Sequence, residues 1–163
     1  MLIKILICLI LGYAIGCFST GYVVGRLNHI DIRNYGSKSA GTTNAIRTLG
    51  WKAGAITFLG DAFKAIIAIL LVQYLMFPSE DYVQLLKLYT GVGVVLGHNY
   101  PFWLRFKGGK GIAATGGIML AFDLRLALIA MILFVVVVAA SRFVSLGSLM
   151  IATLFPVFIF FMY

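Results

Sequence analysis

Apolar residues fill most of this chain in long runs, and short polar segments separate the runs. A membrane-spanning helix needs about 20 mainly apolar residues at about 1.5 Å rise each. Runs that meet or approach this length cover residues 2–24, 60–77, 82–97, 109–122, 124–140 and 143–163. The pattern therefore predicts an all-α, polytopic membrane helix bundle with about six transmembrane helices.

Two of these runs depart from the simple pattern. We expect residues 51–59, which precede the second run, to form a half-turn or an interfacial stretch. The fourth run has only about 14 residues, which fits a half-helix or a thinned span. One long helix over 109–140 is the alternative, but Asp123 and Arg125 interrupt it, so we favour a break there.

Glycines at helical spacing recur within or beside the predicted spans. Small residues let helix backbones approach closely in a membrane, so we interpret them as packing residues. The pairs are Gly12 with Gly16, Gly21 with Gly25, and Gly93 with Gly97.

The composition sets this chain apart from soluble proteins. It is 62% hydrophobic and 11% charged, with 13 Lys and Arg against five Asp and Glu and a net charge of +8. Soluble domains are about 45–50% apolar and about 25% charged. A soluble enzyme, a disordered tail and a disulfide-framework secreted module are excluded, and we expect one integral membrane domain over 1–163. No feature indicates a nucleic acid partner.

Charge separates the connecting segments into two groups. Nine of the thirteen cations fall in the first, third and fifth connections, and these are Arg26, Arg33, Lys38, Arg47, Lys52, Arg105, Lys107, Lys110 and Arg142. Cytoplasmic loops carry such an excess of Lys and Arg. The odd-numbered connections are therefore predicted to be cytoplasmic, with the N-terminus outside.

The first of these connections is rich in glycine and hydroxyl residues over 35–47. Glycines let backbone N–H groups turn toward a ligand, hydroxyls donate hydrogen bonds, and Arg47 can bind phosphate oxygens with two N–H groups. A flexible loop that carries only the cytoplasmic cation bias explains the same composition, and the residues alone leave both interpretations open.

The third connection, residues 97–111, gives a sharper signal. Lys110 lies among Gly108, Gly109 and Gly111 directly before an apolar run, where free N–H groups and the helix dipole favour a phosphate. The spacing is not that of a P-loop. We favour phosphate binding over a plain glycine-rich turn. Aromatic residues expected at the membrane boundary are Phe102, Trp103 and Phe106.

Two further polar groups begin predicted spans. Asp61 and Lys64 are i,i+3 neighbours that can pair on one helix face, either as a structural ion pair or as residues that orient a site. Arg142 begins the sixth span together with three serines, Ser141, Ser145 and Ser148.

The chemistry that is absent narrows the reaction. The acids are not at metal-ligand spacing, the cysteines lie away from the polar loops, and neither His29 nor His98 has an acid four or five residues further on. We therefore expect no metal and no cofactor. The polar groups together predict one cytoplasmic site for a polyanionic ligand with a lipid portion, and a substrate with its own good leaving group suits them.

Four ordered motifs resemble the acyl-phosphate:glycerol-3-phosphate acyltransferases (PlsY) along essentially the whole chain. They are Gly36-Ser37…Gly41-Thr-Thr43-Asn44-Ala-Ile-Arg47, Gly60-Asp61-x-x-Lys64, Gly97-His98-x-x-Pro101-x-Trp-Leu-x-Phe-Lys-Gly-Gly-Lys110-Gly111 and Arg142-Phe-Val-Ser145-Leu. The resemblance implies a multi-pass enzyme of the bacterial inner membrane. Such enzymes transfer a fatty acyl group from acyl phosphate to the 1-hydroxyl of sn-glycerol 3-phosphate, which gives lysophosphatidate and phosphate.

The resemblance also implies roles for individual residues. His98 is the candidate proton acceptor or orienter, and Ser37 and Ser145 join it in the catalytic set. The substrate-binding set is Ser37, Arg47, Lys110 and Arg142, with Asn44 supporting the first loop and the N–H groups of Gly108, Gly109 and Gly111 as anion donors. Asp61 and Lys64 would orient the site. An enzyme that forms acyl phosphate is an expected upstream partner.

Two departures from the family pattern stand out. Its usual Gly-Ser-Gly-Asn is here Gly36-Ser37-Lys38-Ser39, which adds a cation. The family commonly has a seventh span and a basic cytoplasmic tail, so we expect that a C-terminal part is missing after Tyr163. A small membrane anion or phosphate transporter and a non-catalytic membrane subunit are the alternative functions.

Overall fold

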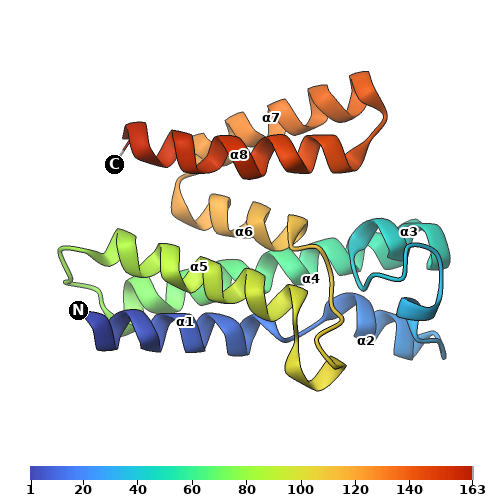
Figure 1. The fold of residues 1–163 in the computed structure, drawn as a ribbon, viewed down its shortest axis with the longest axis horizontal. Helices are drawn as coiled ribbons and strands as arrows, with labels where there is room; N and C mark the ends of the chain where they lie inside the picture. The colour runs from blue at the N-terminus through green and yellow to red at the C-terminus, as the bar shows by residue number, and fades with distance from the viewer. Residues whose placement is uncertain (163) are drawn as a thin grey trace. The chain divides into compact units, whose positions relative to one another are not determined.

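The computed structural model describes residues 1–162, which are helices joined by short loops (Figure 1). The chain divides into two compact units, Met1–Phe122 and Asp123–Tyr163. The candidate polar residues before Asp123 all lie in the first unit, whereas Arg142 and Ser145 lie in the second.

The first predicted span is interrupted. α1 covers Leu2–Gly16 and α2 covers Thr20–Leu27, with Ser19 in an extended conformation between them. The predicted span over 2–24 lies within Leu2–Leu27, which is long and apolar enough to cross a membrane. The helix break inside it falls in an apolar run and leaves no trace in the hydropathy. A continuous helix would direct the Gly16 carbonyl to the N–H of Thr20; here Lys64 donates to that carbonyl instead.

The second predicted span is longer than expected. α3 (Thr42–Leu49) ends at Gly50, whose φ of 89° lies in the left-handed region, and α4 (Trp51–Leu70) begins directly after it. The helix continues in π-helical turns over Leu71–Met76. Residues 51–59 are therefore part of α4 itself, which corrects the expected half-turn or interfacial stretch.

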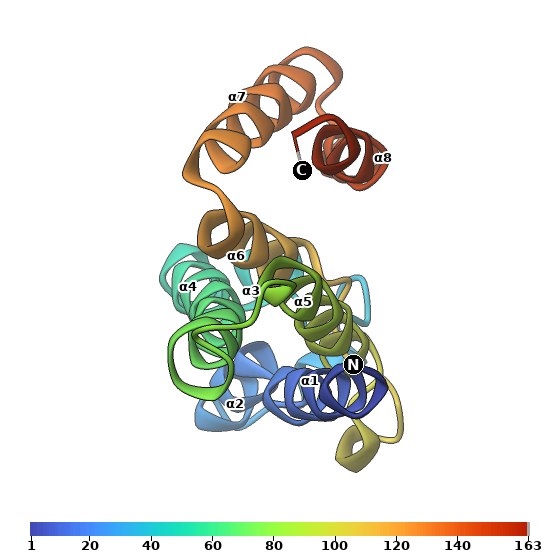
Figure 2. The ribbon, with the colours of Figure 1, turned by 90° about the vertical axis from the view of Figure 1, so that its left-hand side faces the viewer.

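α5 (Val83–Asn99) packs along α1, and both views show the two helices side by side (Figures 1 and 2). Glycines from both helices meet at this contact. A Cβ at Gly16 would lie 2.8 Å from the Cα of Val94, and one at Gly97 would lie 2.8 Å from the backbone nitrogen of Cys17. Since no side chain fits between the backbones, the interpretation of these glycines as packing residues is confirmed.

α6 (Ile112–Phe122) has 11 residues and is as short as the sequence predicts. It packs on α4, where Gly117 lies against the backbone of Ala62. The core between these helices is built from small and branched apolar side chains. Its buried members are Ala65, Ala68, Ile69, Val94, Ala114 and Ile118.

The second unit contains α7 (Leu124–Ser141) and α8 (Val144–Met162), which pack on each other. Asp123 caps α7 by accepting hydrogen bonds from the N–H groups of Arg125 and Leu126. The cap confirms the predicted break at Asp123 and excludes one long helix over 109–140.

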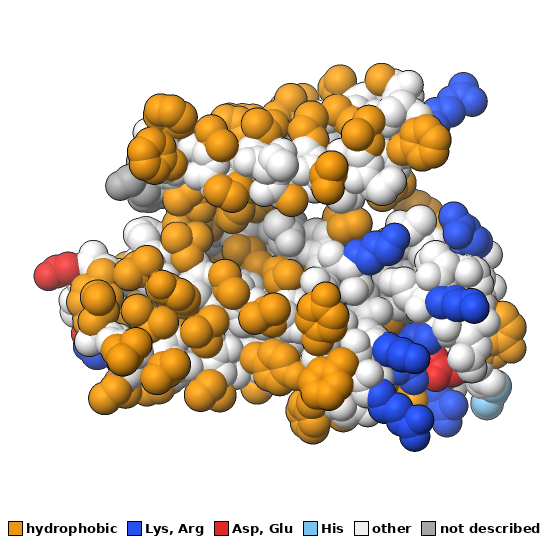
Figure 3. All heavy atoms as spheres, in the orientation of Figure 1, with side chains coloured by type: hydrophobic (Ala, Val, Ile, Leu, Met, Phe, Trp, Pro, Cys, Tyr) orange, Lys and Arg blue, Asp and Glu red, His pale blue; other side chains and the backbone are white. Residues whose placement is uncertain are grey.

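Four described stretches are long and apolar enough to cross a membrane, namely Leu2–Leu27, Trp51–Met76, Leu124–Ser141 and Val144–Phe161. A total of six spans, the outward N-terminus and the single domain over 1–163 stay predictions. On the first unit, Lys and Arg side chains gather at the end that carries α2, α3 and the polar loops, and apolar side chains cover the helices at the other end (Figure 3). This division suits a bundle with one polar surface outside the bilayer.

Candidate active site

A buried polar network lies where α4 and α5 pass the break in the first span. Asp61, Lys64 and His98 are 1%, 6% and 2% exposed. The Lys64 Nζ lies 3.1 Å from the Asp61 Oδ1 and 2.8 Å from the His98 Nδ1, and the Asp61 Oδ1 and the His98 Nδ1 are 3.5 Å apart. The geometry confirms the i,i+3 pair that the spacing predicts. His98 is a third member of this group, and the sequence around Asp61 and Lys64 did not reveal it.

The break between α1 and α2 supplies the remaining partners. Lys64 donates to the carbonyl of Gly16 at 3.0 Å and to that of Phe18, and the Thr20 hydroxyl donates to the Asp61 Oδ1 at 3.2 Å. A buried ammonium group is stable only when it is paired and hydrogen-bonded. The two carbonyls freed by the break meet that need together with Asp61.

His98 has a carboxylate partner in Asp61, although no acid lies four or five residues after it in the sequence. Asp61 comes from another helix, so the pairing has no signature in the spacing around His98. Thr20 was missed for the same reason. The His98 Nδ1 faces Lys64, and the Nε2 faces Gly109, where an added Cβ would overlap it.

The segment from residue 100 to residue 111, here the glycine loop, folds back over His98. The Gly108 N–H donates to the Asn99 carbonyl and the Gly109 N–H to the His98 carbonyl, each at 3.0 Å. A Cβ at Gly108 would overlap the His98 carbonyl oxygen. The loop backbone can therefore approach His98 and Asn99 this closely only because residues 108 and 109 are both glycine.

These bonds correct the expectation that all the glycine N–H groups serve as anion donors. The N–H groups of Gly108 and Gly109 already donate to backbone carbonyls. The N–H groups of Lys110 and Gly111 have no acceptor among the described residues, so these two remain available to bind an anion. Gly111 is in the left-handed region with φ 77°, beside the side chain of Asn99. The Asn99 Oδ1 is buried and without a partner among the described residues, and it was not among the candidates.

The segment from residue 28 to residue 41, here the N-terminal loop, is held by Asn44 from α3. Asn44 is 1% exposed, and its Oδ1 accepts the Ser37 N–H at 2.8 Å. Its Nδ2 donates hydrogen bonds to the carbonyls of Ile32, Tyr35 and Ser39. The side chain supports the loop as expected. A direct role of Asn44 in substrate binding stays a prediction.

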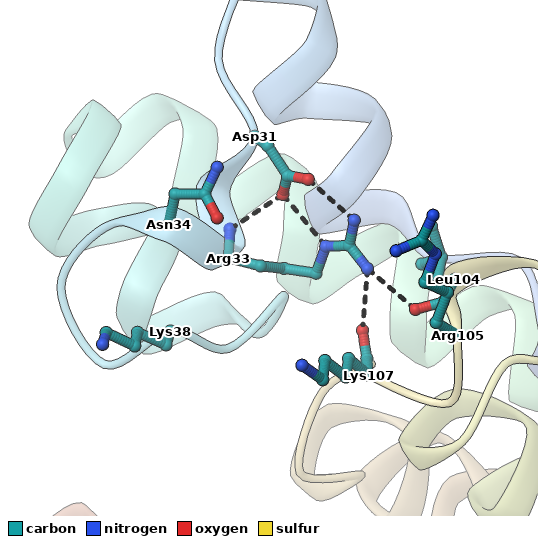
Figure 4. A pocket seen from close by; sticks show the side chains of 7 residues that line it. All are labelled: Asp31, Arg33, Asn34, Lys38, Leu104, Arg105 and Lys107. Atoms are coloured by element: carbon teal, nitrogen blue, oxygen red, sulfur yellow. Dashed lines mark hydrogen bonds and ion pairs between the residues drawn. The ribbon is translucent and has the colours of Figure 1, made fainter.

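The two loops are joined to each other. The Ala40 N–H donates to the Gly108 carbonyl at 3.2 Å, and the Arg33 Nη1 donates to the carbonyls of Leu104 at 2.9 Å and Lys107 at 3.4 Å (Figure 4). Asp31 holds the Arg33 guanidinium from its other side. The hydrogen bond from Arg33 lowers the pKa of Asp31 below its ordinary value. From the sequence, Arg33 was recognised only as one of the loop cations, and its role in joining the two loops was not predicted.

The joined loops bring several predicted side chains to one rim. Ser37, Arg47 and Lys110 are exposed, and the Arg47 Cδ lies 3.4 Å from where a Cβ of Gly36 would stand. Ser37 follows Gly36 directly. Lys110 follows Gly108 and Gly109, and the Gly108 carbonyl accepts the hydrogen bond from the Ala40 N–H. The rim therefore presents a hydroxyl and two cations close to the glycine loop that covers His98.

The other predicted side chains belong to the second unit. Arg142 is exposed and has a left-handed backbone with φ 60°, and Ser145 is exposed in the first turn of α8. Their assignment to the site stays a prediction. Among the described residues, no group of three His, Cys, Asp or Glu side chains could hold a metal ion.

A family model described as glycerol-3-phosphate acyltransferase matches residues 6–163. The curated glycerol-3-phosphate acyltransferase of Alkaliphilus metalliredigens is 45% identical over 156 residues, which cover 95% of this chain and 77% of that protein. The enzyme of the same name from Thermoanaerobacter pseudethanolicus is 43% identical over 141 residues, covering 86% and 68%.

Two crystal structures of PlsY (YgiH), an integral membrane glycerol 3-phosphate acyltransferase, have a similar fold. The glycerol 3-phosphate form superposes with a TM-score of 0.79 at 33% identity, over 94% of this chain and 77% of that one. The lysophosphatidic acid form gives 0.81 at 32% identity, over 96% and 76%.

Proposed function

Since the chain belongs to the glycerol-3-phosphate acyltransferase family, it is an integral membrane enzyme that transfers an acyl group to glycerol 3-phosphate, and we propose that its acyl donor is an acyl phosphate. The 1-hydroxyl oxygen attacks the acyl carbonyl carbon, the bond from that carbon to the phosphate oxygen breaks, and the hydroxyl proton passes to the released phosphate. The products are lysophosphatidate and inorganic phosphate. An enzyme that forms acyl phosphate would supply the donor.

The observation that carries this proposal is the junction of two cationic, glycine-rich loops over a buried histidine. Both substrates carry phosphate, and the exposed Arg47 and Lys110 are suited to bind it together with the Ser37 hydroxyl and the N–H groups of Lys110 and Gly111. An acyl phosphate is a mixed anhydride with its own leaving group, so the reaction needs neither a metal nor a covalent enzyme intermediate. Arg142 and Ser145 complete the proposed set.

The network around His98 supports one of its two candidate roles. With the Lys64 ammonium as the donor to the Nδ1, the ring N–H lies on the Nε2, the atom that faces the glycine loop. We therefore assign His98 as an orienter that donates a hydrogen bond from the Nε2. Asp61 and Lys64 act through it as positioning residues.

The location of the enzyme is also part of the proposal. We place it in the inner membrane of a bacterium, with the N-terminus outside and the two polar loops in the cytoplasm. The cation bias supports this orientation. Glycerol 3-phosphate would then enter from water, while the acyl chain of the donor stays in the bilayer.

A liposome assay tests the reaction directly. The reconstituted protein should release phosphate from acyl phosphate only when glycerol 3-phosphate is present, with one lysophosphatidate formed per phosphate. Release without the acceptor would indicate a hydrolase. No release, combined with phosphate flux across the vesicle wall, would indicate a transporter.

Substitutions test the rim and the histidine separately. Arg47→Ala and Lys110→Ala should raise the KM for glycerol 3-phosphate or abolish turnover, whereas Lys52→Ala, which removes an equally exposed cation on α4, should not. Unchanged kinetics in both rim variants would remove their assignment. For the histidine, ¹⁵N NMR of the ring nitrogens should show a protonated Nε2 at His98 at neutral pH. The exposed His29 serves as an internal reference.

A further inference from the structure

A hollow of about 660 Å³ opens on the surface of the first unit where the two loops meet (Figure 4). The charged residues that line it are Asp31, Arg33, Lys38, Arg105 and Lys107. None of the side chains that we assign to acyl transfer lines it. The hollow is therefore a separate feature beside the candidate active site, and it does not depend on the proposed donor.

The charges around the hollow are unbalanced. The Asp31 carboxylate accepts the Arg33 N–H and Nε at 3.0 and 2.9 Å through one oxygen and the Arg33 Nη2 at 2.7 Å through the other. These two side chains neutralise each other. Lys38, Arg105 and Lys107 have no carboxylate within 4.0 Å among the described residues. Three cations therefore remain for an anionic ligand.

The backbone that carries these cations is held in a rarely occupied conformation. Lys38 has φ 56° and Arg105 has φ 55°, both in the left-handed region where residues other than glycine are uncommon. The surrounding contacts must hold such residues in place, and outliers of this kind concentrate at functional sites. The Arg33 bonds to Leu104 and Lys107 fix the loop on both sides of Arg105.

Exposed apolar side chains lie near these cations in the sequence. Phe106 stands between Arg105 and Lys107 in the chain and is 60% exposed, and Phe102 is 64% exposed. The Trp103 Nε1 donates to the Cys17 carbonyl at 2.9 Å, which anchors the loop to the first span. Exposed aromatics next to cations are typical of the layer where headgroups meet acyl chains.

We infer that the hollow binds the phosphate of an anionic phospholipid headgroup through Lys38, Arg105 and Lys107. The three unbalanced cations attract an anionic phosphodiester, and Phe102 and Phe106 would insert among the neighbouring acyl chains. A soluble phosphate ester offers the same anionic group without those chains. The exposed aromatics therefore favour the lipid as the occupant.

The full chain in detergent micelles can be titrated with phosphatidylglycerol or phosphatidylcholine, and bound lipid counted by native mass spectrometry. We expect tighter binding of phosphatidylglycerol. A cation near an anionic headgroup contributes about fivefold in affinity, so Lys38→Ala and Lys107→Ala should each weaken phosphatidylglycerol binding about fivefold. Phosphatidylcholine binding should not change. Lys52→Ala is the matched control, because it removes one exposed cation away from the hollow.

Two results would overturn the inference. The first is an equal loss of phosphatidylglycerol binding in Lys52→Ala and in Lys107→Ala. Such a result would show that lipid binding depends on the net charge of the protein and not on the hollow. The second comes from titrating the same variants with glycerol 3-phosphate. Loss of that binding with lipid selectivity intact would assign the hollow to a soluble phosphate. Neither of these binding measurements uses phosphate release, which the liposome assay measures. Failure of the proposed reaction can therefore be distinguished from failure of this inference.

Discussion

The N-terminal loop and the glycine loop lie side by side, yet they are held in place by opposite means. One buried side chain, Asn44, organises the N-terminal loop through four hydrogen bonds. The glycine loop is anchored by Arg33 and Trp103, but over His98 it is closed by its own backbone, which bonds to the carbonyls of His98 and Asn99 where Gly108 and Gly109 leave room. Beneath it lies the buried network of Asp61, Lys64 and His98.

This difference shows what each loop can tolerate. A loop that depends on an added side chain fails when that side chain is removed, whereas a loop that depends on missing side chains fails when one is added. The rim cations of the two loops are close together only while both kinds of support persist. The following substitutions separate them.

The largest effect is expected below the glycine loop. Lys64→Met leaves Asp61 buried without its cation and should lower the free energy of unfolding by about 3–5 kcal/mol, measured by unfolding in detergent micelles. The double variant with Asp61→Asn should recover part of this loss because no unpaired charge remains. A single variant as stable as the wild type would show that the buried pair is not ionised.

Adding a side chain to the glycine loop should come next. Gly108→Ala would overlap the His98 carbonyl oxygen and displace the loop; a displacement of about 1 Å can cost about 100-fold in turnover. Gly116→Ala in α6 is the control, since a Cβ there meets nothing within 4 Å. Equal turnover in both variants would mean that the loop has room to adjust.

Removing the organiser of the N-terminal loop should have a smaller effect. Asn44→Ala leaves four backbone groups without their partner, and we expect a loss of about 2 kcal/mol in stability since water can reach part of the loop. Thermal unfolding in detergent measures it, with the exposed neighbour Thr43→Ala as the control. Comparable stability of the two variants would contradict the role of Asn44.

The smallest effect concerns the bond between the loops. The pKa of Asp31 is lowered by the hydrogen bond from Arg33, so this pair stabilises the fold at pH values above the ordinary carboxyl pKa of about 3.9. The stabilisation is lost as the pH falls through the lowered pKa. Arg33→Ala should therefore narrow the difference in melting temperature between pH 6 and pH 3. An unchanged difference would exclude Asp31 as its source.

The sequence predicts best what depends on local periodicity. Hydropathy locates the apolar helices, the polar Asp123 and Arg125 mark the end of α6, and the i,i+3 spacing pairs Asp61 with Lys64. Glycine spacing likewise predicts the close approach of α1 and α5. Each of these rests on a repeat of the helix or on a change in polarity within a few residues.

Features that depend on distant contacts could not be predicted in this way. The break after Gly16 lies inside an apolar run, and the Gly16 carbonyl accepts a hydrogen bond from Lys64 on another helix. The pairing of His98 with Asp61 and the bonds from Arg33 to the glycine loop also join distant parts of the chain. Their residues were visible as charged or polar, but the partners follow only from the fold.

The interrupted first span has a consequence for how sequences of this kind can diverge. The carbonyls of Gly16 and Phe18 accept hydrogens from Lys64, so the kink and the lysine depend on each other. A mutation that straightened the helix would remove two of the acceptors of the Lys64 ammonium, and loss of the lysine would leave the two carbonyls without their donor. We expect the two features to be inherited together, with substitutions around Ser19 appearing in descendants only alongside a change at position 64.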